Sequence, residues 1–287
     1  MKPSESQFPT IRGLTYHVRT WGEPHRPRLF LLHGWMDVSA SFQFLVDCFE
    51  RDWHVIAPDW RGFGLTEWAR EGYWFPDYYA DLDALLDLYQ PDSPVHLIGH
   101  SLGGNIAGVY AGLRPERLAR VVSLEGLGMA RTTPESAPKR VTQWLDAQRD
   151  PPRFTPYASF DEVAGRLKRN NPRLRDDRAQ FLARHWARET ESGVELRSDP
   201  RHKMVNPYVF RIEEALACWR RVTAPVLLVS GKDSHIPGWM KDTADQLAER
   251  KAAFRDLREA ELEDCGHMMH HDQPARLARL IESFITS

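Results

Sequence analysis

A serine lies between closely spaced glycines in the run GHSLGG at residues 99–104, which matches the pattern Gly-x-Ser-x-Gly. The apolar run VHLIG leads into it, and a helical run at residues 105–113 follows it. Glycines suit both flanks because the serine of such a motif lies on a sharp, strained turn with little room for nearby side chains. The turn also aims the first N–H groups of the next helix toward an anion beside the hydroxyl. The pattern therefore predicts Ser101 as an exposed nucleophile.

A serine hydroxyl becomes an effective nucleophile when a base takes its proton and an acid holds that base in place. Downstream of Ser101, Asp233 follows the apolar run VLLVSG, and His267 follows the run EDCG. The chain order of serine, acid and base is the one used by a single serine hydrolase fold. We therefore predict Ser101, Asp233 and His267 as nucleophile, acid and base.

The elements that must position these residues are short apolar strands alternating with helical patterns. Residues with β-branched or leucine-rich composition predict strands at 28–32, 54–58, 95–99, 118–124 and 226–231. Periodic apolar positions predict helices at about 77–89, about 239–249 and after Pro274. Strands that alternate with helices are typical of an α/β protein, and the carboxyl ends of its strands carry the chemistry.

The middle of the chain, from about residue 129 to 218, has no strand-like run, and prolines interrupt its helical stretches. Residues 131–221 contain 19 Lys plus Arg against 13 Asp plus Glu, a net charge of +6, whereas the remainder, 19 against 27, has −8. We therefore expect a basic helical insertion between the two halves of the α/β part.

The composition describes a globular chain of one large domain or two modest ones. The 287 residues are 42% hydrophobic and 11% aromatic, with a formal net charge of −2, which excludes general disorder and argues against a nucleic-acid binder. The three cysteines lie far apart, and His270 and His271 lack a further ligand at metal-site spacing, so we expect no disulfide, metal or cofactor. No apolar run is long enough to cross a membrane, and we expect a cytoplasmic protein.

Together these motifs resemble those of the α/β-hydrolase family. The matching runs are HGW at 33–35, DWRGFG at 59–64, GHSLGG at 99–104, GKD at 231–233 and GH at 266–267. The resemblance implies the α/β-hydrolase fold, a mostly parallel eight-stranded sheet flanked by helices with an inserted helical cap. It places the core domain at residues 1–127 and 222–287 and the cap at 128–221. It also implies that the amides of Trp35 and Leu102 form an oxyanion hole.

Two of the site assignments have competitors in the sequence. His270 and His271 lie close to His267, but only His267 follows the acidic run that the family places before its base. Glu125 follows the strand after the Gly-x-Ser-x-Gly turn at residues 99–104, here called the elbow, and this is the position from which haloalkane dehalogenases take their acid. We favour Asp233 as the acid, and Glu125 then lines the pocket or pairs with an arginine of the cap.

The residue at the elbow favours acyl chemistry. Dehalogenases and epoxide hydrolases of the family attack with a carboxylate, whereas this chain has Ser101. We therefore expect a serine hydrolase that cleaves carboxylic esters or thioesters through an acyl-enzyme, without a cofactor. A ligand receptor, a cofactor-free lyase or an acyltransferase on the same scaffold remains the alternative.

The cap is the part of the sequence that bears on the substrate. Its many aromatic residues suit an apolar acyl pocket, and its basic runs, which include Arg166 and Arg169, suit an anionic handle such as coenzyme A or an acyl carrier protein. A solvated basic face balanced by nearby acids is the competing interpretation. His33, His100 and Glu125 are further candidate substrate contacts, although the two histidines also suit structural roles. The oligomeric state is left open.

Overall fold

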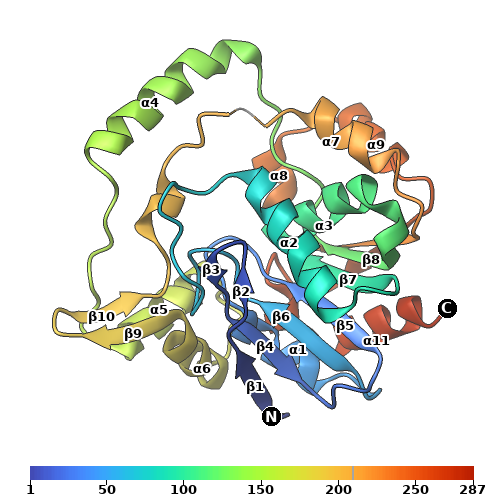
Figure 1. Cartoon of the computed structure of the whole chain (residues 1–287), viewed down its shortest axis with the longest axis horizontal. Helices are drawn as coiled ribbons and strands as arrows, with labels where there is room; N and C mark the ends of the chain where they lie inside the picture. The colour runs from blue at the N-terminus through green and yellow to red at the C-terminus, as the bar shows by residue number, and fades with distance from the viewer. Residues whose placement is uncertain (209) are drawn as a thin grey trace.

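An eight-stranded sheet forms the centre of the molecule in the computed structural model, which describes residues 1–208 and 210–287 (Figure 1). Its strand order is β1-β4-β6-β5-β7-β8-β11-β12. The strands are β1 (Ser4–Gln7), β4 (Val18–Trp21), β5 (Arg28–Leu32), β6 (His54–Pro58), β7 (Val95–His100), β8 (Leu118–Leu124), β11 (Val226–Gly231) and β12 (Leu257–Leu262). Only the pairings of β4 with β1 and β6 are antiparallel among these. The prediction of a mostly parallel, eight-stranded α/β-hydrolase sheet is therefore confirmed.

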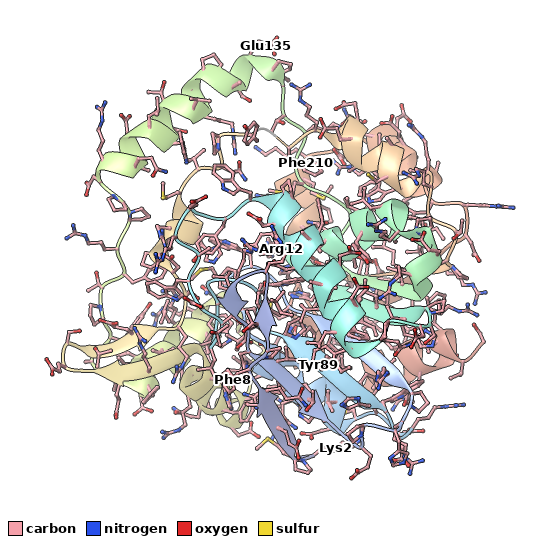
Figure 2. All side chains as sticks on the ribbon, viewed as in Figure 1. Lys2, Phe8, Arg12, Tyr89, Glu135 and Phe210 are labelled. Atoms are coloured by element: carbon pink, nitrogen blue, oxygen red, sulfur yellow. The ribbon has the colours of Figure 1, made fainter. Side chains whose placement is uncertain are left out.

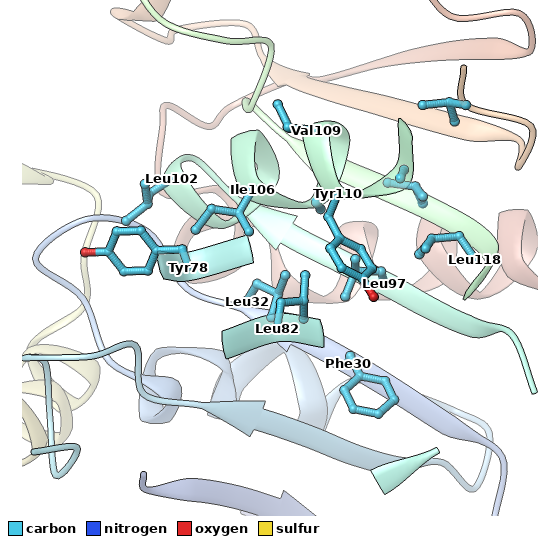
Figure 3. Packing of buried hydrophobic residues seen from close by; sticks show 14 of the residues in the cluster. Phe30, Leu32, Tyr78, Leu82, Leu97, Leu102, Ile106, Val109, Tyr110 and Leu118 are labelled. Atoms are coloured by element: carbon cyan, nitrogen blue, oxygen red, sulfur yellow. The ribbon is translucent and has the colours of Figure 1, made fainter. Parts of the chain in front are cut away.

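Helices cover both faces of this sheet, and the strands bury side chains against both. In β5, Phe30 and Leu32 belong to the cluster packed under one set of helices, while Leu29 and Leu31 belong to the cluster on the other face. The first face carries α2 (Phe75–Tyr89), α3 (Leu102–Leu113) and α7 (Ile212–Trp219); the second carries α1 (Gln43–Asp47), α10 (Met269–Asp272) and α11 (Pro274–Ile285). Figure 3 shows the first cluster, with side chains from β5, β7, α2 and α3 in contact with one another.

The strands predicted at 28–32, 54–58, 118–124 and 226–231 are confirmed residue for residue, and β7 is one residue longer than predicted. The predicted helix at 239–249 is two helices, α8 (Ile236–Met240) and α9 (Ala244–Ala252). Lys241 has a φ of 55°, which ends α8, and Thr243 starts α9 with a capping box. The left-handed backbone at Lys241 and the cap at Thr243 divide the predicted helix, and the spacing of apolar residues does not indicate either of them.

The segment predicted as an insertion, residues 128–221 between β8 and β11, contains more than helices. It includes α4 (Ala137–Arg149), α5 (Phe160–Asn170), α6 (Asp176–Trp186) and the antiparallel hairpin β9 (Ala187–Thr190) and β10 (Gly193–Leu196). The expectation that this segment lacks strands is wrong, because two four-residue strands are too short to give a clear pattern. Val194 and Leu196 of the hairpin are buried with Val163 and Leu182 in a third apolar cluster.

The two ends of the insertion differ in how they pack. At its C-terminal end α7 packs on α3, and Trp219 is buried in the core cluster. At its N-terminal end α4 has no buried residue, and Figure 1 shows it standing away from the sheet. Figure 2 shows Glu135, just before α4, at the opposite end of the molecule from Lys2. Among the described residues, every helix is too short or too polar to span a bilayer.

A buried ion pair joins the loop after β6 to α2. Arg61 donates from Nε and Nη2 to the two carboxylate oxygens of Asp81, both at 2.6 Å. The Tyr16 hydroxyl donates to Asp81 at 2.6 Å as well. The pair fixes the start of the segment between β6 and α2, and residues 70–75 at the other end of that segment line a cavity.

Replacing Asp81 should destabilise the fold strongly. Asp81→Ala leaves the buried Arg61 with only its longer ion pair to Asp77, at 3.3 Å, and we expect a loss of about 3–5 kcal/mol in the free energy of unfolding, measured by urea denaturation. Asp52→Ala removes an ion pair to Arg26 in which the aspartate side chain is 77% exposed, and it should leave the midpoint nearly unchanged. Equal effects of the two substitutions would contradict this reasoning.

Candidate active site

Ser101 occupies the sharp turn between β7 and α3. Its φ of 52° and ψ of −112° are strained for a residue with a side chain. A Cβ atom on Gly99 would lie 2.3 Å from the backbone of Gly103, and one on Gly103 would lie 2.2 Å from the carbonyl oxygen of Leu32. The glycines are therefore required by close backbone contact, and the turn leaves Ser101 lining a cavity.

The loop after β5 passes against this turn. A Cβ atom on Gly34 would lie 2.9 Å from Nδ1 of His100 and 3.4 Å from Cβ of Ser101. Trp35 and Leu102 line the same cavity as Ser101. Leu102 is the first residue of α3, so its N–H group has no acceptor within the helix. The two residues predicted for an oxyanion hole are thus brought together around Ser101.

His267 lies in the loop between β12 and α10 and lines the cavity with Ser101. Its Nδ1 is 2.9 Å from Oε2 of Glu125. Since a carboxylate accepts, Nδ1 carries the proton and Nε2 is left free to accept one. The carbonyl oxygen of His267 accepts a 2.9 Å hydrogen bond from Nε2 of His100, which holds this loop against the elbow.

Glu125 directly follows β8 and has a φ of 58°. Its carboxylate accepts hydrogen bonds from the Gly231 amide at 2.9 Å and from the Ser234 hydroxyl at 2.5 Å, besides that from His267. Burial raises the pKa of Glu125, but the hydrogen bonds from His267, Ser234 and Gly231 outweigh burial and lower the pKa overall. The carboxylate next to His267 is therefore ionised at neutral pH.

The prediction that Asp233 holds His267 is wrong in this geometry, and the alternative, Glu125, takes that place. The side chain of Asp233 is 48% exposed and accepts a 2.7 Å hydrogen bond from Arg173 of the insertion. The adjacent Ser234 points the other way and donates to Glu125. Glu125 follows β8 and Asp233 follows β11, and these parallel strands end at the same edge of the sheet. The direction of each side chain therefore decides which of the two carboxylates contacts His267.

His33 and His100 are buried and face other protein groups. His33 accepts a 2.8 Å hydrogen bond from the Trp60 amide at Nε2 and donates from Nδ1 to the Gly34 carbonyl oxygen at 2.7 Å. Burial lowers the pKa of both histidines, so both are neutral at pH 7. Neither lines the cavity, so the structure favours their structural roles over substrate contact.

The basic residues of the insertion also lie away from the cavity wall. Arg166 donates to the Tyr157 hydroxyl, and neither Arg166 nor Arg169 lines the cavity, so the structure does not support them as substrate contacts. Most other cations of the basic runs have acidic partners. These pairs are Lys168 with Asp176, Arg173 with Asp233 and Arg175 with Asp177.

The cavity has a volume of about 610 Å³ and lies between the sheet edge and the insertion. Aromatic side chains form part of its walls, and the charged side chains of Arg70, Glu71 and Arg201 line it as well. The aromatic side chains are Trp35, Tyr73, Trp74, Phe75, Tyr78, Trp144 and Trp239. The sequence reasoning missed the residues from the segment before α2, although the dense aromatic run YWF at 73–75 was a signal for them.

Behind the elbow lies a group of residue types that bind metals. Potential ligand atoms of Asp37, His100 and His270 lie within 4.8 Å of one another, and all three residues are buried. The expectation that no metal binds rested on the lack of ligands near His270 in the sequence. The fold supplies two partners from distant segments.

Comparison with known proteins defines the class. The family model of the alpha/beta hydrolase fold matches residues 27–274, and the chain belongs to that family. It is similar to a serine hydrolase-like protein of Danio rerio, 29% identical over 98% of this chain and 88% of the relative. It is also similar to a 3-hydroxybutyrate-oligomer hydrolase of Cupriavidus necator, 28% identical over 93% of this chain and 91% of the relative.

Among solved structures, the thioesterase domain from the curacin biosynthetic pathway superposes with a TM-score of 0.86. It is 23% identical, and the match covers 98% of this chain and 99% of that domain. At this identity the similarity supports the fold. The family and the curated relatives support a hydrolase.

Ser101 should be the residue that reacts with a fluorophosphonate probe, because the elbow exposes its hydroxyl beside His267. Peptide mapping of the labelled protein should find the adduct on Ser101 alone, and Ser101→Ala should not be labelled. His267→Ala should slow the labelling, since the hydroxyl then lacks a base. An adduct on another serine would contradict the assignment.

Proposed function

We propose that the chain is a serine hydrolase that cleaves carboxylic esters or thioesters of small molecules through an acyl-enzyme. One observation carries the proposal: His267 is held at 2.9 Å by a buried carboxylate, and its ring lines the same cavity as the serine of the elbow. Ser101 is then the nucleophile, His267 the base, and Glu125 the acid of the triad. Family membership and the curated relatives support this reading.

In the first half of the reaction, Oγ of Ser101 attacks the carbonyl carbon, and its proton passes to Nε2 of His267. The amides of Trp35 and Leu102 are proposed to donate to the oxyanion of the tetrahedral intermediate. When the intermediate collapses, His267 gives the proton to the leaving alcohol or thiol. The acyl group remains as an ester on Ser101.

In the second half, water attacks the acyl-enzyme, and His267 takes a proton from that water. The carboxylic acid leaves, the proton returns to Oγ of Ser101, and the enzyme is restored. Throughout, Glu125 holds Nδ1–H and stabilises the imidazolium that forms. Three hydrogen bonds keep Glu125 ionised for this task.

The cavity supports a compact substrate with an apolar part. Its aromatic walls suit an apolar acyl or alcohol group, and 610 Å³ is in the range of small-molecule sites. One relative is named as a hydrolase of 3-hydroxybutyrate oligomers, and short esters of hydroxy acids therefore belong in a substrate panel with simple acyl esters.

Substitution of Glu125 should reduce turnover far more than substitution of Asp233. Glu125→Gln removes the charge beside His267 and permits the wrong tautomer, and we expect a fall in kcat of about 10⁴-fold, as for the aspartate of the best-studied triad. Asp233→Asn loses only an exposed contact with Arg173 and should change kcat less than about 3-fold. The assay is hydrolysis of p-nitrophenyl acyl esters of graded chain length.

Two outcomes of this assay would count against the proposal. An inactive Asp233→Asn with an active Glu125→Gln would mean that the triad acid is misassigned. Little turnover by the wild type across p-nitrophenyl esters, thioesters and hydroxy-acid esters would favour a ligand receptor on this scaffold. Ser101→Ala provides the zero-activity control.

An acyl-CoA or acyl carrier protein substrate is less well supported, because none of the cations at residues 166–175 lines the cavity and three of them, Lys168, Arg173 and Arg175, pair with acids. We expect kcat/KM for an acyl-CoA and for a neutral ester of the same acyl group to change in parallel with ionic strength. A steep fall for the acyl-CoA alone, through the range where the Debye length drops below ~10 Å, would instead indicate electrostatic steering by the insertion.

A further inference from the structure

Three buried side chains meet behind the elbow, and each comes from a segment that carries a proposed catalytic group. Asp37 lies two residues after Trp35, His100 directly precedes Ser101, and His270 lies three residues after His267. The exposed fractions of Asp37, His100 and His270 are 2%, 2% and 0%. None of these three side chains has a task in the reaction proposed above.

Polar atoms of this cluster lack hydrogen-bond partners among the described residues. They are Oδ2 of Asp37, Nδ1 of His100 and both ring nitrogens of His270. The closest ionic contact joins Nε2 of His270 to Oδ2 of Asp37 at 3.8 Å, which is too long for a hydrogen bond. Buried polar atoms without a partner are rare in proteins, so the cluster calls for an occupant.

The remaining atoms of two of these side chains are fully engaged, and this orients the unpaired ones. Nε2 of His100 donates to the His267 carbonyl oxygen, which leaves Nδ1, the nitrogen beside Gly34, as an acceptor without a partner. Oδ1 of Asp37 accepts from the Val38 amide at 2.8 Å and from Trp186 at 3.1 Å, so Oδ2 is the free oxygen. Metal ligands in proteins are typically held by outer hydrogen bonds of this kind.

We propose that Asp37, His100 and His270 bind a divalent transition-metal ion, with Zn²⁺ the best match to two imidazoles and one carboxylate. Ligand atoms of a tetrahedral zinc ion lie about 3.4 Å apart, against a spread of up to 4.8 Å here. Side-chain shifts on the order of 1 Å would close the site, and water would complete the coordination. The ion would connect the loop after β5, the elbow and helix α10.

The role is structural, because the ion would lie behind the elbow and none of its three ligands lines the cavity. The neighbours that face the cluster are His33, His267 and His271, and Asp37 is its only carboxylate among the described residues. The competing occupant is a single bound water molecule that accepts and donates hydrogen bonds with the same three side chains. If the site holds water, added zinc should not bind there.

The test is metal binding by the whole chain after dialysis against a chelator. Isothermal titration with ZnCl₂ should give one site per chain, the melting temperature should rise with zinc concentration, and Co²⁺ should give the visible absorption of a tetrahedral site. Asp37→Asn and His270→Asn should bind Zn²⁺ at least about 10-fold more weakly. His271→Asn is the matched control, since His271 is equally buried and bonds to Ser41.

The wild type decides the question even if a variant fails to fold. No Zn²⁺ or Co²⁺ binding tighter than about 10 µM by the folded wild type would overturn the proposal and leave a water-filled cluster. Equal loss of binding in His271→Asn and His270→Asn would also overturn it. Neither readout depends on turnover, so the result stands apart from the proposed hydrolase activity.

Discussion

Ser101 holds a backbone conformation, with a φ of 52°, that persists only where the surrounding structure enforces it. The enforcement comes from close backbone contact: Gly103 abuts the Leu32 carbonyl oxygen, and Gly104 lies against Ser123 and Gly126. The elbow therefore links the ends of β5, β7 and β8, and none can shift without opening the turn. Helix α3 begins at that turn, and its first residue, Leu102, lines the cavity.

A second constraint is the buried charge of Glu125. An ionised carboxylate is stable there only because donors surround it, and those donors come from the turn after β11 and from the loop after β12. Glu125 thereby docks His267, Ser234 and Gly231 onto the end of β8. Glu125, the loop that carries His267 and the turn after β11 form one hydrogen-bonded unit beside the elbow.

These two constraints explain what could be predicted from the sequence. The elbow is a local steric requirement, so its glycines mark Ser101 directly, and strands buried on both faces read as apolar runs. The mostly exposed β1 and the short β9 and β10 give no such run. The choice between Glu125 and Asp233 depends on side-chain direction and on distant partners, Ser234 for one and Arg173 for the other. Neither partner is identifiable from spacing along the chain.

The cavity depends on a third and weaker kind of contact. Its outer wall includes Trp144 of α4, a helix with no buried residue, and Trp144 packs on Trp74 with ring centroids 6.2 Å apart. The Tyr208 ring also packs on Trp74, edge to face, with ring centroids 5.9 Å apart. Separation of α4 from the core would therefore expose little additional apolar surface to water, which makes this helix a low-stability part of the fold. A substrate in the cavity that contacts both Trp74 and Trp144 would add apolar contacts to each and so favour, by its own binding, the arrangement in which α4 lies against the core.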